Sequence, residues 1–443
     1  MAEKLTADDV RRICKEQNIH FIRLQFTDIL GMMKNIAITV DELDKALNNE
    51  MMFDGSSIEG YVRIEESDMR LVPDPSTFTV LPWLNDYRIA RMICDIARPN
   101  GDPFEGDPRY VLRKALKKAA DLGYDFFVGP ECEFFLFQTD EKGNPTTNTH
   151  DQASYFDLGP VDNGEIARIE MVEMLMKMGF AVEAAHHENA PGQHEIDFKY
   201  SDALHAADNI ITFKLVVKVV AKKNGLHATF MPKPINNECG NGMHCNMSLF
   251  KEGKNAFYDA NDKNGLSKEA YWFVAGLLKH ARAMSAITNP IVNSYKRLVP
   301  GYEAPVYVTW SLGNRSPLIR IPVARGTGTR LEMRNPDPAC NPYLALAAML
   351  TAGLEGIEKQ LEPPAPRDEN IYHMSMEERE AQGIQNLPVN LQEAIAALKQ
   401  DELIYDALGA HVFENFVKAK QIEWDRYAKN VHPWETAQYL KLY

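Results

Sequence analysis

The chain has 443 residues, of which 45% are hydrophobic and 25% charged, with a formal net charge of −14 at pH 7. This length exceeds what a single hydrophobic core usually fills, so two domains are expected, and the acidic balance argues against general nucleic-acid binding and against an anionic membrane surface. The six cysteines form no CxxC pair, and the N-terminus lacks an apolar export signal. Both features are typical of a cytoplasmic protein with reduced thiols.

The first hundred residues alternate between helical and strand-like patterns. Thr6-Ala7-Asp8-Asp9 resembles a capping motif and predicts a short helix ending near Gln17. Residues 20–26, 36–40 and 89–96 have strand patterns. The turn-rich segment 98–103 predicts a domain boundary, giving domains 1–103 and 104–443.

Beyond this boundary, helices and strands mix without an internal repeat. The predicted helices span residues 107–123, 164–178, 206–224, 268–287, 342–360 and 391–399. The predicted strands span residues 126–137, 180–188, 194–200, 226–230, 242–250 and 305–310. The acidic segment 361–379 is predicted to be a surface loop, and the uncharged segment 338–354 is predicted to be a buried helix that is too short and polar to cross a membrane.

The stretch 329–334 has the two-residue period of a strand. It places Arg330, Glu332 and Arg334 on one face, with Leu331 and Met333 on the other. Six arginines, no lysine and two acids lie between residues 297 and 334. Such a concentration of guanidinium groups is suited to a polyanion such as a triphosphate.

Carboxylates recur at strand spacing in two other places. Glu131 and Glu133 share one face of an apolar strand, where their like charges predict a compensating cation; the alternative, in which both face solvent at the start of the strand, stays open. Pro191-Gly192 excludes a continuous helix, so Glu188 and Glu195 are expected to flank a turn. Oxygen ligands favour Mg²⁺ or Mn²⁺ over zinc, and the neighbouring histidines are interpreted as packing or supporting groups.

A glycine-containing turn precedes a further alternating stretch, in which His244, Asn246 and Ser248 share a face. If these polar faces converge, they form a funnel in which acids hold cations and arginines hold phosphates. Phosphoryl transfer depends on that positioning and charge neutralisation. The chain has neither a GxxxxGK[ST] loop nor a kinase signature, so those phosphate-binding frameworks are excluded.

Five motifs, in the same order, resemble those of glutamine synthetase. They occupy residues 52–58, 129–135, 233–244, 293–305 and 314–316. The resemblance covers essentially the whole chain and implies an α+β fold. A small N-terminal β-grasp-like domain would precede a large C-terminal catalytic domain, whose curved antiparallel sheet forms a funnel-shaped active site. It also implies a homo-dodecamer of two hexameric rings with active sites shared between adjacent subunits.

The resemblance assigns roles residue by residue. One divalent ion would be held by Glu133, Glu188 and Glu195, and a second by Glu131, His244 and Glu332. ATP would contact Glu183, Tyr200, Asn246, Ser248, Arg315, Arg320 and Arg330. The substrates glutamate and ammonium would be bound by Gly240, Arg297, Glu303 and Arg334.

The implied catalytic residues are Asp54, Glu303 and Arg315. Asp54 would come from the adjacent subunit and take a proton from ammonium, Glu303 would close a flap over the intermediate, and Arg315 would contact the transferring phosphoryl group. The implied reaction joins ammonium to L-glutamate through γ-glutamyl phosphate, with ATP converted to ADP and phosphate. Arg63 matches a residue that takes part in feedback inhibition by glutamine in short bacterial members.

Two departures and two alternatives accompany this resemblance. The family's usual Asn-Gly-Ser-Gly-Met-His turn has Cys239 and Asn241 in place of its asparagine and serine, and the short segment around Tyr372 argues against the adenylylation seen in longer forms. One alternative is a ligase that joins another amine to glutamate. The other is a non-catalytic member or one that acts as a partner of a transcription regulator, which should have lost metal ligands or phosphate-binding arginines.

Overall fold

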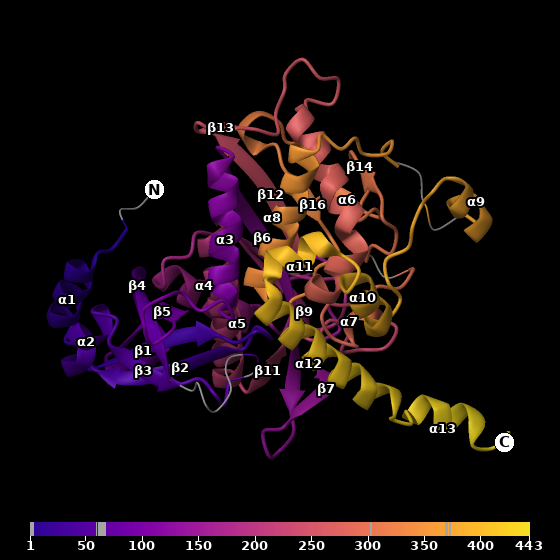
Figure 1. Ribbon diagram of the computed structural model, residues 1–443. Coiled ribbons are helices and arrows are strands. Elements are labelled where there is room, and N and C mark those ends of the chain that lie inside the picture. Colours follow the sequence, from indigo (N-terminus) through magenta and orange to yellow (C-terminus); the bar gives the residue numbers. More distant parts are fainter. Residues whose placement is uncertain (1–3, 59, 61–67, 302–303, 368–370, 372–373) are drawn as a thin grey trace.

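The computed structural model describes residues 4–58, 60, 68–301, 304–367, 371 and 374–443 (Figure 1). The N-terminal part builds one sheet, in which β1 and β5 are parallel and the other neighbours antiparallel. In spatial order its strands are β2 (Met33–Thr39), β1 (Phe21–Thr27), β5 (Ile89–Ala97), β4 (Asp68–Val80) and β3 (Met51–Asp54). Helices α1 (Ala7–Glu16) and α2 (Leu43–Leu47) accompany it.

The predicted first helix is confirmed, with its cap. The Thr6 side chain accepts from the Asp9 backbone N–H, and the Asp9 carboxylate accepts from the Thr6 backbone N–H. Strand β4 was not predicted, because Pro73 and Pro75 interrupt its pattern. The pairing of β4 with β5 accommodates them through a register shift between Asp74 and Thr79.

The larger sheet carries most of the polar residues that the sequence predicts for the functional site. Within the described ranges its main path runs β14 (Trp310–Ser311), β15 (Ile319–Arg320), β16 (Leu331–Met333), β12 (Met243–Lys251), β6 (Asp125–Thr139), β9 (Gln193–Phe198) and β8 (Val182–His187). These neighbours are antiparallel, apart from the parallel pair β14 and β15. Short strands β7 (Pro145–Thr149), β10 (Ser201–Asp202), β11 (Leu226–Thr229) and β13 (Lys254–Asn255) pair along β6 and β12.

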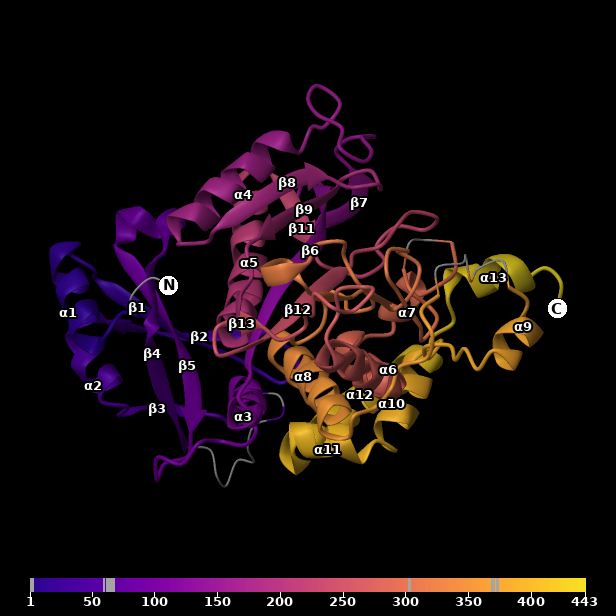
Figure 2. The ribbon, with the colours of Figure 1, turned by 90° about the horizontal axis from the view of Figure 1, so that it is seen from above.

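The helices of the C-terminal part are α3 (Pro108–Asp121), α4 (Glu165–Lys177), α5 (Ala203–Lys223), α6 (Lys268–Thr288), α7 (Ser294–Arg297), α8 (Pro342–Glu358), α9 (Met376–Ala381), α10 (Leu391–Leu398), α11 (Glu402–Leu408), α12 (Ala410–Ala428) and α13 (Pro433–Tyr439). Of these, α3, α5, α6 and α8 are grouped beside the apolar side of the larger sheet (Figure 2). Helix α13 projects away from the body (Figure 1). In the part of the chain that the structure describes, none of the helices has the length and apolarity needed to cross a bilayer.

Alternation along the strands divides the sheet into two chemically different faces. Leu331 and Met333 of β16 and Cys245 and Met247 of β12 are buried in the main hydrophobic core. Cys132 of β6 lies in the same core, beneath the helices. The intervening residues therefore point to the opposite face, where the polar side chains gather.

Two sequence predictions in this part need correction. Of the strand predicted over residues 305–310, only Trp310 lies in β14, because the preceding backbone bonds to residues 385–387 instead. The loop predicted over 361–379 contains the start of α9. The α+β class is confirmed by the mixed sheets and helices, while the domain boundary at 103/104 stays a prediction.

A buried arginine links the N-terminal sheet to the helices of the C-terminal part. Arg109, in the first turn of α3, donates to Asp74 of β4 (2.9 Å) and Asp95 of β5 (2.7 Å). It also donates to both carboxylate oxygens of Asp208 in α5, at 3.0 and 2.9 Å. The Tyr343 hydroxyl of α8 donates to Asp208 as well (2.7 Å). One guanidinium thereby neutralises acids from three elements, and its bonds fix how α3 sits against both parts.

Replacing Arg109 by alanine should lower the free energy of unfolding by about 3–5 kcal/mol, because Asp208 and its neighbours would remain buried without their cation. Urea denaturation followed by circular dichroism measures this. Arg113→Ala is the matched control: Arg113 contacts Asp74 and Asp95 but is partly exposed, so its loss should cost about 1 kcal/mol or less. Equal losses for the two variants would contradict the role assigned to Arg109.

Candidate active site

The register of the larger sheet aligns its polar residues in three cross-strand rows. His244 of β12 lies opposite Glu131 of β6, and Glu131 lies opposite Asp197 of β9. A neighbouring row joins Arg320, Glu332 and Asn246. The third row joins Glu133, Glu195 and His186. Because the rows are two residues apart on each strand, all of these side chains project from the same face.

The first acidic group consists of Glu131, His244 and Glu332, whose potential ligand atoms lie within 4.8 Å of one another. The His244 Nδ1 atom is 3.3 Å from Glu131 Oε2 and 3.9 Å from Glu332 Oε1. Burial raises the pKa of Glu131, but hydrogen bonds from His244 and Asn246 outweigh it and hold that pKa at about 2. Three residues distant in sequence thus present one histidine and two carboxylates to one point.

The second acidic group consists of His186, Glu188 and Glu195, again with ligand atoms within 4.8 Å. His186 Nε2 lies 2.9 Å from Glu188 Oε1 and 3.8 Å from Glu195 Oε1. Glu133 faces the same small cavity as Glu188. It accepts hydrogen bonds from Gln193 Nε2 and the Gly242 backbone N–H, both at 2.9 Å.

The electrostatics of this group fit a divalent cation. Burial, and then the charge of neighbouring Glu133, raise the pKa of Glu195 well above its ordinary value. Burial also raises the pKa of Glu133, and the charge of Glu188 adds to that effect. Holding these carboxylates ionised together is therefore costly unless a positive charge joins them. A set rich in carboxylate oxygens suits Mg²⁺ or Mn²⁺.

A small cavity of about 40 Å³ lies beside both groups. Its lining includes the substrate-binding candidates Gly240, Arg297 and Arg334, together with Cys239. Arg297 is buried and donates to the carbonyls of Asn335 (2.8 Å) and Arg334 (3.1 Å). Arg334 is ion-paired with Glu332, while its buried Nε has no hydrogen-bond partner. Of the two arginines, Arg334 therefore has the unsatisfied donor.

A larger cavity of about 510 Å³ borders the first acidic group, with Glu131 in its lining. Its lining includes the ATP-binding candidates Glu183, Tyr200, Asn246, Ser248 and Arg330, with residues 327–329 beside them. Arg330 Nε donates to Asn246 Oδ1 (3.0 Å), and Asn246 Nδ2 donates to Glu131 Oε1 (2.8 Å). A chain of hydrogen bonds thus connects this cavity to the first acidic group.

The other predicted residues are placed as follows. Arg320 pairs with Glu332 (2.7 Å), and Arg315 lies beside Tyr155, outside the lining of both cavities. Asp54 ends β3 in the N-terminal part and lines neither cavity; hydrogen bonds from Ser56 lower its pKa. Glu303 and Arg63 lie outside the described residues.

Sequence reasoning missed three residues of this face. His186 directly contacts Glu188 and Glu195, although it was interpreted as a packing or supporting group. Asp197 lines the larger cavity, and burial followed by the charge of Glu131 raises its pKa to about 6. Its spacing of two from Glu195 was a signal that could have found it. Gln193, which bonds Glu133, lies two residues before Glu195 and has the same signal.

Comparisons with known proteins agree over nearly the whole chain. Residues 18–99 match the glutamine synthetase β-grasp domain, and residues 105–439 match the glutamine synthetase catalytic domain. The chain is 60% identical over 441 residues to a glutamine synthetase of Clostridium saccharobutylicum (99% of this chain, 100% of the relative). It is 57% identical over 440 residues to one of Staphylococcus aureus strain MW2 (99% of each chain).

Solved structures show the same likeness. A complex of GmaS with ADP superposes with a TM-score of 0.89 at 34% identity, covering 100% of both chains. The cryo-EM structure of Plasmodium falciparum glutamine synthetase gives a TM-score of 0.86 at 29% identity, covering 98% of each chain. The match to the β-grasp domain supports the fold expected for the N-terminal part.

Glu195→Gln should affect the metal-free and metal-loaded protein in opposite directions. In chelator at pH 8, removing one of several crowded charges should raise the thermal midpoint by about 2–4 °C, the shift that ~1 kcal/mol produces in a large domain. Because folding raises the pKa of Glu195, ionising this carboxyl lowers the stability of the folded protein. This loss is absent at a pH below the pKa of Glu195 in the unfolded chain, and it is complete at a pH above its pKa in the folded protein. The gain should therefore vanish as pH is lowered toward about 4.

With Mn²⁺ at about 100 times its dissociation constant, the wild type should gain about 2.7 kcal/mol, and Glu195→Gln should lose most of that gain. Differential scanning calorimetry in chelator and in Mn²⁺ measures both effects. Glu173→Gln, on the exposed side of α4, is the control and should behave like wild type. A variant that is stabilised by Mn²⁺ as much as wild type would argue against a cation at this group.

Proposed function

The chain belongs to the glutamine synthetase family, and from this premise we propose how its residues divide the work of ATP-dependent glutamine synthesis. The observation that carries the proposal is the convergence of two acidic groups on one sheet face, between a small cavity with an unsatisfied arginine and a larger one. That arrangement is suited to bringing a carboxylate substrate and a nucleotide together across two cations.

The chemistry explains why both substrates must meet there. The γ-carboxylate of glutamate is a poor acyl donor, because its oxygen is a poor leaving group. Transfer of the γ-phosphoryl group of ATP converts that oxygen into a phosphate, which leaves when ammonia attacks the acyl carbon. The products are glutamine, ADP and phosphate.

We assign the larger cavity to ATP. Its 510 Å³ is in the range of small-molecule sites, and Glu183, Tyr200, Asn246 and Ser248 line it. Arg330 lines this cavity and is hydrogen-bonded to Asn246, so its guanidinium would bind a phosphate group there. Arg315 and Arg320 would complete the phosphate contacts. The ADP held by GmaS is consistent with a nucleotide at this kind of site.

Divalent ions would be held by Glu131, His244 and Glu332, and by Glu133, Glu188 and Glu195. When bound, such ions neutralise the phosphate charge that builds up during transfer. The residues supply what the ions require: buried oxygens, a positioned histidine, and crowded charges that a cation would relieve. His186 is a further candidate ligand or support, given its contacts with Glu188 and Glu195. Whether the ion is Mg²⁺ or Mn²⁺ stays open.

Glutamate is assigned to the small cavity. Arg334 would receive a substrate carboxylate through its unpartnered Nε, and Gly240 lines the same cavity. Arg297, whose donors already bond backbone carbonyls, would act mainly by holding residues 334–336 in place and adding positive charge. This refines the substrate-binding role predicted for Arg297.

Ammonium requires an acid that takes its proton, and Asp54 is proposed for this. Its carboxylate is exposed and ionised, in a part of the chain away from both cavities, so it would act across an interface between two copies. That requirement supports an oligomer; the specific assembly proposed is a dodecamer of two hexameric rings in the cytoplasm. Glu303 is proposed to close the site and exclude water.

The activity is tested by incubating the protein with glutamate, ammonium, ATP and Mg²⁺ or Mn²⁺. Glutamine, ADP and phosphate should form in equal amounts, and putrescine in place of ammonium should give little product. Asp54→Asn should raise the ammonium concentration needed for half-maximal rate and lower the rate by about 10²-fold, the lower range of a lost acid–base group. No product with either ion would favour a non-catalytic member, and faster turnover of putrescine would favour the amine-ligase alternative.

Assembly and regulation are tested together. Mass photometry should give a particle about twelve times the 50.1 kDa chain mass. Added glutamine should inhibit the wild type, and Arg63→Ala should remove that inhibition while leaving the uninhibited rate within about twofold. Unchanged inhibition in Arg63→Ala would remove the feedback role. A transcription-regulator partner stays a prediction.

A further inference from the structure

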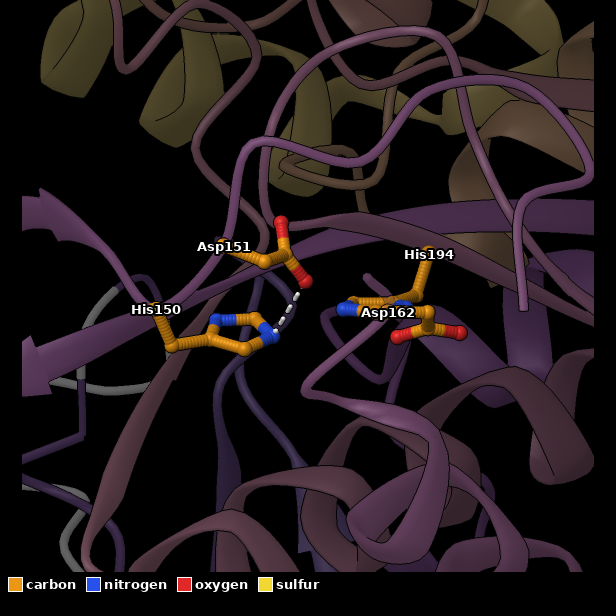
Figure 3. A group of neighbouring side chains, drawn as sticks. All are labelled: His150, Asp151, Asp162 and His194. Atoms are coloured by element: carbon orange, nitrogen blue, oxygen red, sulfur yellow. Dashed lines mark ion pairs between the residues drawn. The ribbon is translucent and has the colours of Figure 1, made fainter. Parts of the chain in front are cut away.

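A third cluster of metal-type side chains lies beside the second acidic group. It consists of His150, Asp151, Asp162 and His194, and Figure 3 shows them converging from different segments. Their potential ligand atoms lie within 4.8 Å of one another, and most of the cluster is buried. By residue type alone this would be a further metal site.

Two of the four residues, His194 and Asp162, already have hydrogen-bond partners. Arg168 Nη1 lies 2.9 Å from His194 Nδ1, and a guanidinium can only donate. The proton of the neutral His194 ring is therefore on Nε2, which leaves that atom no lone pair for a metal. Asp162 accepts from Arg168 Nη2 (2.7 Å) and the Gly164 backbone N–H (2.9 Å). The cluster already carries its own cation in Arg168.

Asp151 has a different set of partners. Its Oδ1 atom accepts from the Gly192 backbone N–H (2.9 Å) and lies 3.3 Å from His187 Nε2. Its Oδ2 atom is 3.0 Å from His150 Nε2 (Figure 3). His187 Nδ1 in turn donates to the Glu188 carbonyl (2.7 Å). The two His187 nitrogens therefore face two oxygen atoms, Asp151 Oδ1 and the Glu188 carbonyl.

These contacts hold both ends of one turn. His187 ends β8 and Gly192 directly precedes β9, so the Asp151 carboxylate bridges the two ends of the 187–193 turn. The turn is closed by the Gln193 carbonyl accepting from the Glu188 backbone N–H (2.8 Å). Gly192 has a φ of +70°, and a Cβ there would lie 2.9 Å from the Leu136 carbonyl oxygen. The turn therefore also packs closely against β6.

The turn carries residues that the active site uses. Glu188 begins it and contributes to the second acidic group, while Gln193 ends it. Gln193 Nε2 donates to Glu133 Oε2 (2.9 Å) and to the Gly240 carbonyl (3.2 Å). A displacement of the turn would therefore move one carboxylate of the group directly and loosen another through Gln193.

We propose that Asp151 is a positioning residue for cation binding. By contacting both His187 and Gly192, it holds the 187–193 turn in the conformation that places Glu188 beside Glu195. The proposal rests on the function assigned above. We assign Asp151 no direct contact with substrate or cation, because its side chain is fully buried, its Oδ1 atom is engaged by His187 and Gly192, and its Oδ2 atom faces His150. Supporting groups of this kind typically change metal affinity 10- to 100-fold.

The test compares Asp151→Asn with Asp162→Asn. Both replace a buried carboxylate of the same cluster by its isosteric amide, but Asp162 bonds Arg168 and the start of α4 rather than the turn. Mn²⁺ binding is measured by the electron paramagnetic resonance signal of unbound Mn²⁺ in a titration of the full-length protein. Asp151→Asn should weaken one class of Mn²⁺ site about 10- to 100-fold, and Asp162→Asn should change it less than about threefold.

Activity supplies a second readout. In Asp151→Asn the Mn²⁺ concentration for half-maximal glutamine synthesis should rise by the same factor, while the rate at saturating Mn²⁺ stays within about threefold of wild type. If Asp151→Asn does not fold, His187→Phe decides, because it keeps a ring in the same place and removes both hydrogen bonds; it should weaken Mn²⁺ in the same range.

Wild-type affinity in Asp151→Asn, or equal weakening in Asp162→Asn, would overturn the proposal. Failure of the proposed function looks different. There the wild type itself would bind no Mn²⁺ or make no glutamine, whereas a failure of the positioning role leaves Mn²⁺ binding and glutamine synthesis intact in the wild type.

Discussion

The structure depends on the confinement of many carboxylates to one face of a single sheet. Glu131, Glu133, Glu195 and Glu332 lie within three neighbouring rows, with Glu188 at the adjoining turn. Burial, and then repulsion from the neighbouring carboxylates, raise the pKa of Glu195 well above its ordinary value. Such an arrangement persists because the rest of the fold offsets the repulsion and because a bound cation can reduce it. The same repulsion that costs stability makes the face a strong cation receptor.

The reverse side of the sheet supplies the compensation. Every second residue of β6, β12 and β16 enters a continuous core under α3, α5, α6 and α8, so each acidic side chain is fixed by buried apolar neighbours in sequence. Arg109 then ties this core to the N-terminal sheet through three aspartates. Rigid strands are better than loops at holding charges that repel, because strand positions cannot relax away from one another.

Positively charged side chains surround the acidic face. Arg320 and Arg334 bracket Glu332, and Arg330 extends the positive side toward the larger cavity through Asn246. Behind the turn at 187–193, Asp151 is held by two histidines, and Asp162 by Arg168. Buried atoms without a hydrogen-bond partner occur in both regions: Arg334 Nε and Asp197 Oδ1 near the acidic face, and Asp151 Oδ2 and His194 Nε2 behind the turn. The residues behind the turn are held by burial and by their ion pairs.

The sequence by itself determined which residues share a face. A period of two predicted that Glu131 and Glu133, His244 and Asn246, and Arg330 and Glu332 would lie together along their strands, and the core on the opposite side bears this out. The tertiary structure alone decided which strands are neighbours and in what register, so that His244 meets Glu131 and Glu133 meets Glu195. It also decided that Asp151 clamps a turn whose first residue, His187, lies 36 residues further along the chain. Periodicity is a local property of the backbone, whereas register comes from packing between segments far apart in the chain, which no local pattern records.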